Sequence, residues 1–118
     1  MSLSKEQQIF TRHIAELICY ANSIDIELTF GEAYRTIEQQ EIYVKQGKSK
    51  TMNSKHLKRL AVDFNFFING KLVYDFYKVK SLGEFWISLD PKNRWGGDWN
   101  KNGVADGFLD TPHFERNF

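Results

Sequence analysis

A carboxylate that needs a partner is the first chemical clue in this chain. Asp63 lies within NSKHLKRLAVDFNFF, residues 53 to 67, which otherwise reads as a buried strand. Alternation from residue 61 onward sends the large apolar side chains to one face and Asp63 to the other. A desolvated carboxylate without compensation is costly or loses its charge. We therefore expect a cation or a hydrogen-bond donor beside Asp63.

Two of the three histidines stand where they could share a metal ion with Asp63. His56 and His113 each lie in a polar turn that borders an apolar stretch. Zinc takes neutral imidazole and carboxylate ligands, and a catalytic site uses three of them and leaves one position for water. The dication would also hold the carboxylate ionised. In the alternative interpretation, Asp63 pairs with Arg59 or a lysine and both histidines are only hydrogen-bonded.

Asp110 and Arg35 are candidates for the chemistry itself. Asp110 precedes His113 by three residues, and Pro112 restricts the residue before it to an extended conformation. A carboxylate beside a zinc ligand can take a proton from water that the metal has activated, and later protonate a leaving amine. Arg35 could clamp a substrate carboxylate or stabilise an oxyanion. The alternatives are a turn residue for Asp110 and a surface cation for Arg35.

A second stretch, DWNKNGVADG, matches the start of a calcium loop. The oxygen ligands would come from Asp98, Asn100, Asn102 and Asp106. Gly103 stands at the sixth position, but Leu109 replaces the bidentate glutamate of the twelfth. The sequence thus predicts a weak Ca²⁺ site, or else a glycine-rich turn that positions the segment containing Asp110 and His113.

Length, composition and charge limit which classes of protein this chain can belong to. The 118 residues predict one domain over 1–118, and 42% hydrophobic with 15% aromatic residues is a globular composition. A net charge of +1 argues against a nucleic-acid partner, although residues 45–50 and 55–59 form a basic region. Neither a signal peptide nor a membrane-spanning stretch is recognisable. We expect a monomer made in the cytoplasm, with no membrane insertion.

Helix signals recur three times along the chain. Each is a capping box, in which a serine or threonine is followed three residues later by Glu or Gln. They predict a helix over 5–21 from Ser4, a helix of about ten residues from Thr36 that Gly47 ends, and a third helix from Ser81 that stops at Asp90-Pro91.

Strand signals lie between these helices. Residues 24–30 alternate apolar and polar side chains, and Asn69-Gly70 is a strong hairpin signal that folds 61–68 onto 71–74. The remainder after residue 92 is rich in glycine and reads as loop. Because strands and helices are segregated and do not alternate, the class is α+β.

Four motifs in order carry a family resemblance: GEAYRTIEQQ, SKHLKRLAVD, WGGDW and DTPHFE. Together they make the chain, from about residue 31 to 115, similar to the zinc D,D-carboxypeptidase and L-alanyl-D-glutamate endopeptidase family, which includes phage endolysins. The resemblance implies a hedgehog/D,D-peptidase-like fold, with a small antiparallel sheet packed against three helices.

The resemblance also implies roles for particular residues. Asp110 would be the catalytic acid and base, Arg35 would stabilise the reacting carbonyl, and Ser54 would hydrogen-bond near the ligands or substrate. The chain departs from the family at Arg59, where a glycine is common. The implied zinc ligands are His56, Asp63 and His113.

The function implied is zinc-dependent hydrolysis of an amide bond in peptidoglycan stem peptides. The enzyme would be an L-alanyl-D-glutamate endopeptidase or a D-Ala-D-Ala carboxypeptidase, a phage or prophage endolysin that acts on the cell wall after release. The alternative function is a non-catalytic, zinc-containing wall-binding domain on the same scaffold. Asp110 distinguishes the two, because a structural zinc site fills its fourth position and needs no neighbouring base.

Overall fold

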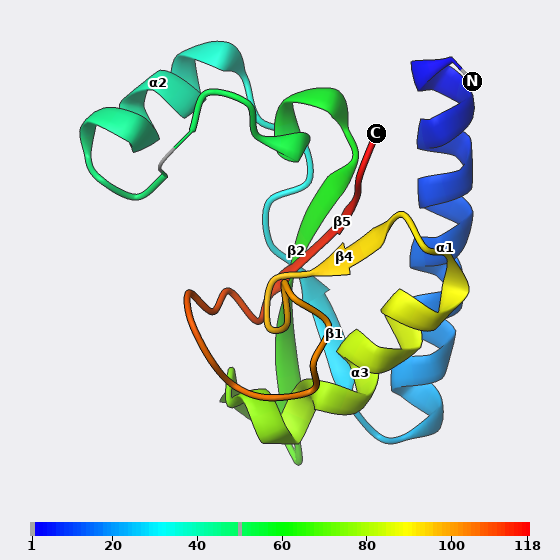
Figure 1. Cartoon of the computed structure of the whole chain (residues 1–118). Helices are drawn as coiled ribbons and strands as arrows, with labels where there is room; N and C mark the ends of the chain where they lie inside the picture. Colours follow the sequence, from blue (N-terminus) through cyan, green and yellow to red (C-terminus); the bar gives the residue numbers. More distant parts are fainter. Residues whose placement is uncertain (1, 50) are drawn as a thin grey trace.

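The computed structural model describes residues 2–49 and 51–118. Helices and strands are segregated along this part of the chain, so the predicted α+β class is confirmed (Figure 1). The α-helices are α1 (Leu3–Ser23), α2 (Ile37–Lys45) and α3 (Phe76–Leu89), and a 3₁₀ turn, η1, covers Lys55–Lys58. The strands are β1 (Glu27–Phe30), β2 (Ala61–Ile68), β3 (Lys71–Val73), β4 (Asn93–Trp95) and β5 (His113–Arg116).

The sheet is antiparallel and centred on β2. Its strand order is β1-β2-β5-β4, and β3 pairs with β2 through the hairpin. Helices α1 and α3 pack together against this sheet, whereas α2 projects from the body of the molecule (Figure 1). The sheet face under α1 and α3 therefore carries the core, and the opposite face is free to hold polar side chains.

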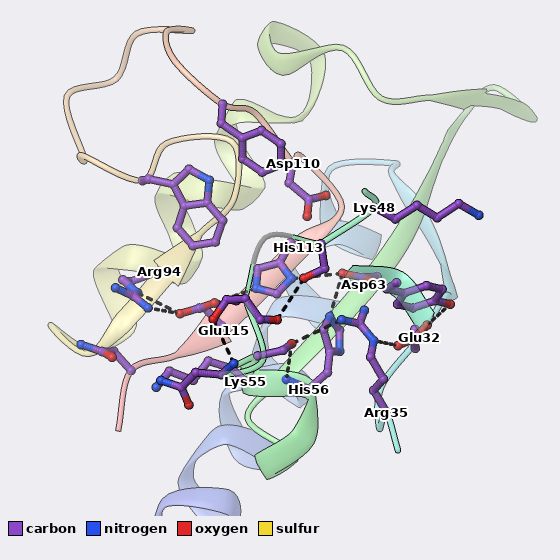
Figure 2. A pocket seen from close by; sticks show the side chains of 18 of the residues that line it. Glu32, Arg35, Lys48, Lys55, His56, Asp63, Arg94, Asp110, His113 and Glu115 are labelled. Carbon is purple, nitrogen blue, oxygen red and sulfur yellow. Dashed lines mark hydrogen bonds and ion pairs between the residues drawn. The ribbon is translucent and has the colours of Figure 1, made fainter. Parts of the chain in front are cut away.

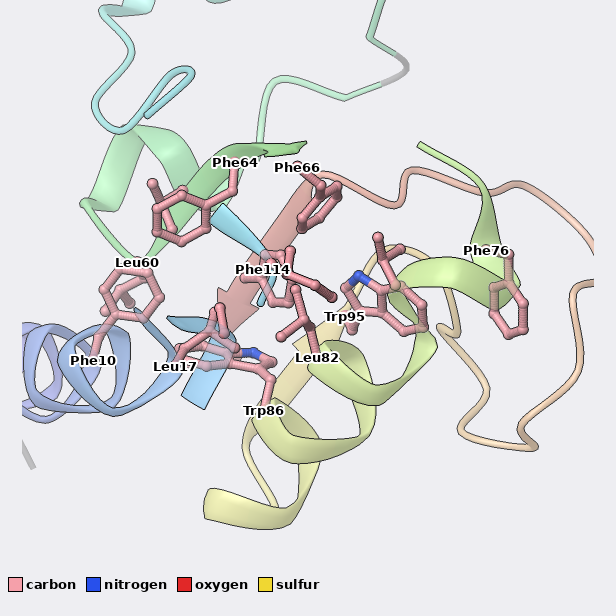
Figure 3. Packing of buried hydrophobic residues seen from close by; sticks show 14 residues of the cluster. Phe10, Leu17, Leu60, Phe64, Phe66, Phe76, Leu82, Trp86, Trp95 and Phe114 are labelled. Carbon is pink, nitrogen blue, oxygen red and sulfur yellow. The ribbon is translucent and has the colours of Figure 1, made fainter. Parts of the chain in front are cut away.

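Aromatic side chains from the helices and the sheet fill the core (Figure 3). The alternation read from β2 is confirmed, since Val62, Phe64 and Phe66 are buried while Asp63 is only partly so. Complete burial of side chains of this size contributes about 1.5–3 kcal/mol each, so this face supplies much of the stability. The largest buried members are Trp86, Trp95, Phe64, Phe66 and Phe114.

The helix starts show which capping signals the chain uses. Ser2, Thr36 and Asp75 are the N-caps, and each side chain accepts a hydrogen bond from the backbone N–H three residues on. The Thr36 prediction is confirmed. The predicted caps Ser4 and Ser81 are wrong, because Ser2 and Asp75 cap the two helices further toward the N-terminus. In α3 the earlier start also buries Phe76 and Val79.

The predicted hairpin at Asn69-Gly70 is confirmed, whereas the first predicted strand is too long. The hairpin forms with positive φ at both Asn69 and Gly70. Strand β1 is shorter than the predicted 24–30, since Ile24 still caps α1 and Asp25 takes a φ of 61°. Strands β4 and β5 lie in the segment that the sequence presents as loop, and they complete the sheet beside the site.

No helix in the described ranges 2–49 and 51–118 combines the length and the hydropathy that a membrane span requires.

Candidate metal centre

Sheet register brings two of the predicted ligands together. Asp63 on β2 and His113 on β5 are cross-strand partners, and Nδ1 of His113 lies 3.3 Å from Oδ1 of Asp63. His56 reaches the same oxygen through Nε2 at 3.4 Å. One donor atom from each of the three lies within 4.8 Å of the others. Figure 2 shows the three side chains directed toward one another. Residues separated by half the chain thus form one compact donor set.

The turn η1 fixes His56 in a single orientation. Ser54 caps this turn by accepting a hydrogen bond from the His56 backbone N–H at 3.2 Å. The His56 ring is 2% exposed, and its Nδ1 lies 3.1 Å from the carbonyl oxygen of Ala33. Because a carbonyl only accepts, Nδ1 carries a proton, and Nε2 is the nitrogen that faces Asp63 and is placed to bind a cation.

Arg59 ends the same turn, at the position where the family resemblance leads us to expect glycine. Its backbone is left-handed, with φ 56° and ψ 37°, and its N–H bonds to the His56 carbonyl at 3.3 Å. The guanidinium stacks 4.0 Å from the centroid of the Tyr34 ring. The chain therefore makes the glycine-type turn with an arginine, and the stacking offsets part of the strain.

The three side chains of the donor set shift one another's pKa values. Burial tends to raise the pKa of Asp63, but hydrogen bonds from His113 and His56 hold it well below its usual range. Burial tends to lower the pKa of His113, yet its hydrogen bonds to Asp63 and Glu115 raise it to about 9. Two imidazoles and a carboxylate are ligands that zinc takes, so the residues fit a Zn²⁺ site.

Asp110 is held beside this donor set by a tight turn. Its N–H bonds to the Gly96 carbonyl at 2.8 Å, and its own carbonyl accepts from the His113 N–H at 3.0 Å. A Cβ on Gly96 would lie 2.2 Å from the Asp110 carbonyl oxygen. The carboxyl group points toward the donor set (Figure 2), and burial raises its pKa. No described residue donates a hydrogen bond to it, which leaves it available to a substrate or to water.

Arg35 lies on the other side of the donor set, in a fixed position. Its Nε is ion-paired with Glu32, and its Nη1 donates to Gln40 at 2.7 Å and to Ser54 at 3.4 Å. The guanidinium also lies 4.8 Å from the Tyr43 ring centroid. Within the described chain its Nη2 has no hydrogen-bond partner, so this nitrogen can donate to a bound ligand.

One cleft of about 830 Å³ is lined by the site residues Arg35, Ser54, His56, Asp63, Asp110 and His113. Trp99 and Phe108 also line it, together with Lys48 and Lys55 from the basic region seen in the sequence. A volume of this size is in the range of ligand-binding clefts and leaves room for a peptide across the donor set. Two lysines of the basic region thus belong to the cleft, whereas Lys50 lies outside the described residues.

Some residues of the site escape the sequence analysis. Glu32 and Gln40 hold Arg35, and nothing in their spacing marks them. Glu115 contacts His113 from 2.7 Å. Its position two residues after His113 on a strand places both side chains on one face, and that alternation is a signal that could have identified it.

The residues of the predicted calcium loop also lie together, in a turn closed by its own hydrogen bonds. Asp98 accepts from the backbone N–H groups of Asn102 and Gly103 at 3.1 and 2.8 Å. Asp106 accepts from the side-chain amides of Asn100 and Asn102 at 3.3 and 2.9 Å. Both carboxylates are therefore already supplied with donors.

Comparison with known proteins places this geometry in a family. A family model described as phage L-alanyl-D-glutamate peptidase matches residues 2–116. The L-alanyl-D-glutamate peptidase of Listeria phage A118 is 36% identical over 114 residues, which is 87% of this chain and 35% of that protein. The chain thus spans about a third of the length of this curated relative.

Two solved structures share the fold. The Serratia marcescens L-Ala D-Glu endopeptidase ChiX matches with a TM-score of 0.73 and 23% identity, over 94% of this chain and 80% of that one. The vancomycin-resistance D,D-pentapeptidase VanY, in complex with Zn(II), matches with a TM-score of 0.56 and 20% identity, over 91% and 70% of the two chains. The predicted D,D-peptidase-like fold is confirmed.

The family model covers nearly the whole chain, and the motifs that suggested the resemblance fall within it. The relative from Listeria phage A118 is itself named an L-alanyl-D-glutamate peptidase, and its match covers 87% of this chain. The chain therefore belongs to the phage L-alanyl-D-glutamate peptidase family.

Proposed function

We propose that this chain is a zinc-dependent peptidase that hydrolyses the L-alanyl-D-glutamate bond of peptidoglycan stem peptides. The main supporting observation is that the donor atoms of His56, Asp63 and His113 share one cleft with the carboxyl group of Asp110, to which no described residue donates a hydrogen bond. A structural zinc domain has no use for an unpaired carboxyl group beside the metal, whereas a hydrolase needs one.

His56, Asp63 and His113 would hold the zinc ion through Nε2, a carboxylate oxygen and Nδ1. Zinc there would supply Lewis acidity and a water of lowered pKa, at about 7. With three protein ligands, a fourth coordination position would remain for water, as in catalytic zinc sites. The zinc ion would also keep Asp63 ionised, a role that the hydrogen bond from His113 has without the metal.

Asp110 would move the protons. Burial raises the pKa of its carboxyl group, which brings it closer to the working pH than an exposed aspartate. In the ionised form it would take a proton from the attacking water, and in the protonated form it would return that proton to the leaving amine. Its backbone bonds to Gly96 and His113 keep it at a constant place relative to the ligands.

Arg35 would stabilise the negative charge that develops on the scissile carbonyl oxygen. Glu32 and Gln40 occupy its Nε and Nη1, so the free Nη2 is the donor for that oxygen. A donor whose position is fixed in advance loses little entropy when the substrate binds, and donors of this kind contribute about 10²–10³ in kcat.

Family membership supports the choice of substrate and of the place of action. The family description and the name of the Listeria phage A118 relative both specify the L-alanyl-D-glutamate bond, which favours an endopeptidase over a carboxypeptidase. A peptidase of this kind from a phage or prophage acts as an endolysin on the cell wall. The open cleft suits a stem peptide that continues in both directions from the cut.

The test is digestion of purified peptidoglycan by zinc-loaded protein and by its Asp110→Asn variant, with mass spectrometry of the fragments. We expect new L-alanine carboxyl termini and D-glutamate amino termini from the unmodified protein alone. Cleavage at another stem bond would correct the substrate. Wall binding without cleavage by either protein would instead identify a non-catalytic zinc-containing wall-binding domain.

Calcium at the loop of Asp98, Asn100, Asn102 and Asp106 stays a separate prediction. A calcium ion would have to replace hydrogen bonds that these carboxylates already accept, and only two of the four side chains are acidic. We propose weak binding, with a dissociation constant of about 10⁻⁴–10⁻³ M, which is the range of extracellular calcium-binding modules.

A further inference from the structure

We propose that Glu115 is a positioning residue for the metal centre. Its carboxylate accepts the Nε2–H of His113 and so presents the Nδ1 lone pair of His113 to the cation. This inference rests on the proposed zinc site and adds to it a residue outside the ligand set and outside the reacting groups.

The register of three strands builds this contact. Glu115 follows His113 by two residues on β5, so both side chains point from the same face of the strand. Across β2, Asp63 faces His113 and the small Ala61 faces Glu115. Across β4, Arg94 faces Glu115. Side chains therefore follow one another across the sheet in the order Asp63, His113, Glu115, Arg94.

Each oxygen of the Glu115 carboxylate has its own partner. Oε1 lies 2.7 Å from Nε2 of His113, and Oε2 accepts from Nε of Arg94 at 2.8 Å and is ion-paired with its Nη2 (Figure 2). Glu115 is 5% exposed, whereas the side chain of Arg94 is 37% exposed at the cleft. Arg94 thus compensates the buried charge and leaves one oxygen directed at His113.

The contact determines which nitrogen of His113 can bind a cation. A neutral imidazole has one N–H and one lone pair, and the hydrogen bond at one nitrogen selects the other as ligand. Nδ1 lies 3.3 Å from the same Asp63 oxygen that Nε2 of His56 approaches. Nε2 of His113 faces Glu115 instead, away from the donor set. A glutamate at this place therefore orients the ring and raises the basicity of Nδ1.

The backbone of Glu115 is anchored independently of this role. Its carbonyl accepts a hydrogen bond from Nε1 of the buried Trp86 at 3.1 Å. Replacement of the side chain therefore leaves this link between β5 and α3 in place. A Glu115→Gln variant keeps the size of the side chain and removes its charge.

The experiment compares zinc affinity, by competition with a chromophoric chelator, in the unmodified protein and in Glu115→Gln. Residues that hydrogen-bond to a metal ligand typically contribute about 10- to 100-fold to metal affinity. We expect Glu115→Gln to lose zinc affinity by a factor in that range. The matched control is Glu6→Gln, which removes the charge of another buried glutamate; neither Glu6 nor its cationic partners Lys92 and Arg116 line the cleft. It should lower thermal stability and leave zinc affinity unchanged.

A second measurement needs no variant. In zinc-loaded, ¹⁵N-labelled protein, long-range ¹H–¹⁵N spectra should show His113 with a protonated Nε2 and a metal-bound Nδ1. Metal at Nε2, or equal zinc affinity in Glu115→Gln and the unmodified protein, would overturn the role of Glu115 alone. Absence of zinc binding by the unmodified protein would overturn the proposed function, and this inference with it.

Discussion

Asp63 and His113 are cross-strand partners, and Oδ1 of one lies 3.3 Å from Nδ1 of the other. The partner that a buried carboxylate on β2 requires is therefore supplied by a strand from the far end of the chain. Both histidines contact the same oxygen of Asp63, so this aspartate is the shared element of the donor set.

Replacement of Asp63 by alanine should abolish tight zinc binding. The variant loses a ligand and also the charge that orients both imidazoles, so we expect a loss greater than the roughly 100-fold typical of outer residues. Chelator competition measures it, and peptidoglycan cleavage should disappear in parallel. Asn65→Ala is the control, since Asn65 follows Asp63 by two residues on β2 and bonds to Thr29 and Tyr74. One equivalent of zinc at unmodified affinity in Asp63→Ala would refute the ligand assignment.

Zinc affinity should rise with pH up to about 9. The hydrogen bonds to Asp63 and Glu115 raise the pKa of His113 to about 9 from an ordinary 6.5, so the metal-free protein holds a proton on this ring at neutral pH. Zinc must displace that proton. The apparent affinity should therefore increase about tenfold per pH unit between 7 and 9 and level off above. Calorimetry in buffers of different ionisation enthalpy should show proton release at pH 7.5, and a flat profile would contradict this.

The candidate site residues His56, Asp63, His113 and Asp110 stand out in the sequence because ionisable residues bordering apolar stretches require a physical explanation. The structure brings all four to one cleft, and their roles there stay a prediction. The α2 cap and the hairpin are predictable too, since their signals are local: a threonine at Thr36 and the Asn69-Gly70 pair.

Elements stabilised by distant contacts are the ones that sequence reasoning misses. Strand β4 has three residues, too few for a visible alternation, and all four residues of β5 are buried, so no polar face marks it. Helix α3 begins at Phe76 because its first turn packs in the core, where Phe76 stacks on Trp95 at 5.4 Å. The pairing of β4 with β5 and the packing of the first turn of α3 both depend on tertiary contacts, which short sequence patterns do not show.

Gly96→Ala should disrupt the position of Asp110. The added Cβ would lie 2.2 Å from the Asp110 carbonyl oxygen and 3.0 Å from the Cβ atoms of Asp110 and His113. Because one obstacle is backbone, we expect destabilisation at or above the upper end of the about 1–3 kcal/mol usual for overpacking, and a loss of cleavage. Denaturant unfolding and peptidoglycan digestion measure the two effects.

Gly107→Ala separates this effect from general destabilisation of the loop. Gly107 has a φ of 66° but open space where a Cβ would be added, so alanine there costs about 1–2 kcal/mol through the backbone alone. Cleavage should persist in this variant at temperatures where it is folded. Equal stability and activity of Gly96→Ala and the unmodified protein would show that the turn is not constrained as described.

Arg35→Ala should lower kcat by about 10²–10³ and leave zinc binding intact. Arg35 donates to Glu32, Gln40 and Ser54 and does not contact the donor set through its side chain, so the metal ligands keep their positions. Arg12→Ala, an exposed arginine on α1, is the control for loss of positive charge. An unchanged kcat with a raised KM would assign Arg35 to ground-state binding of the substrate instead.

Calcium should have little effect on cleavage at micromolar concentration. The turn at residues 98–106 is closed without an ion, since Asp98 accepts from two backbone N–H groups and Asp106 from two asparagine amides. An ion must compete with these donors and lacks the bidentate glutamate that gives such loops tight binding. Activity of zinc-loaded protein should therefore be equal in chelator-treated buffer and in buffer with about 10 µM Ca²⁺, roughly tenfold below the lowest dissociation constant expected. Activation by micromolar Ca²⁺ that Asp98→Asn removes would show instead that the ion orders the segment leading to Asp110.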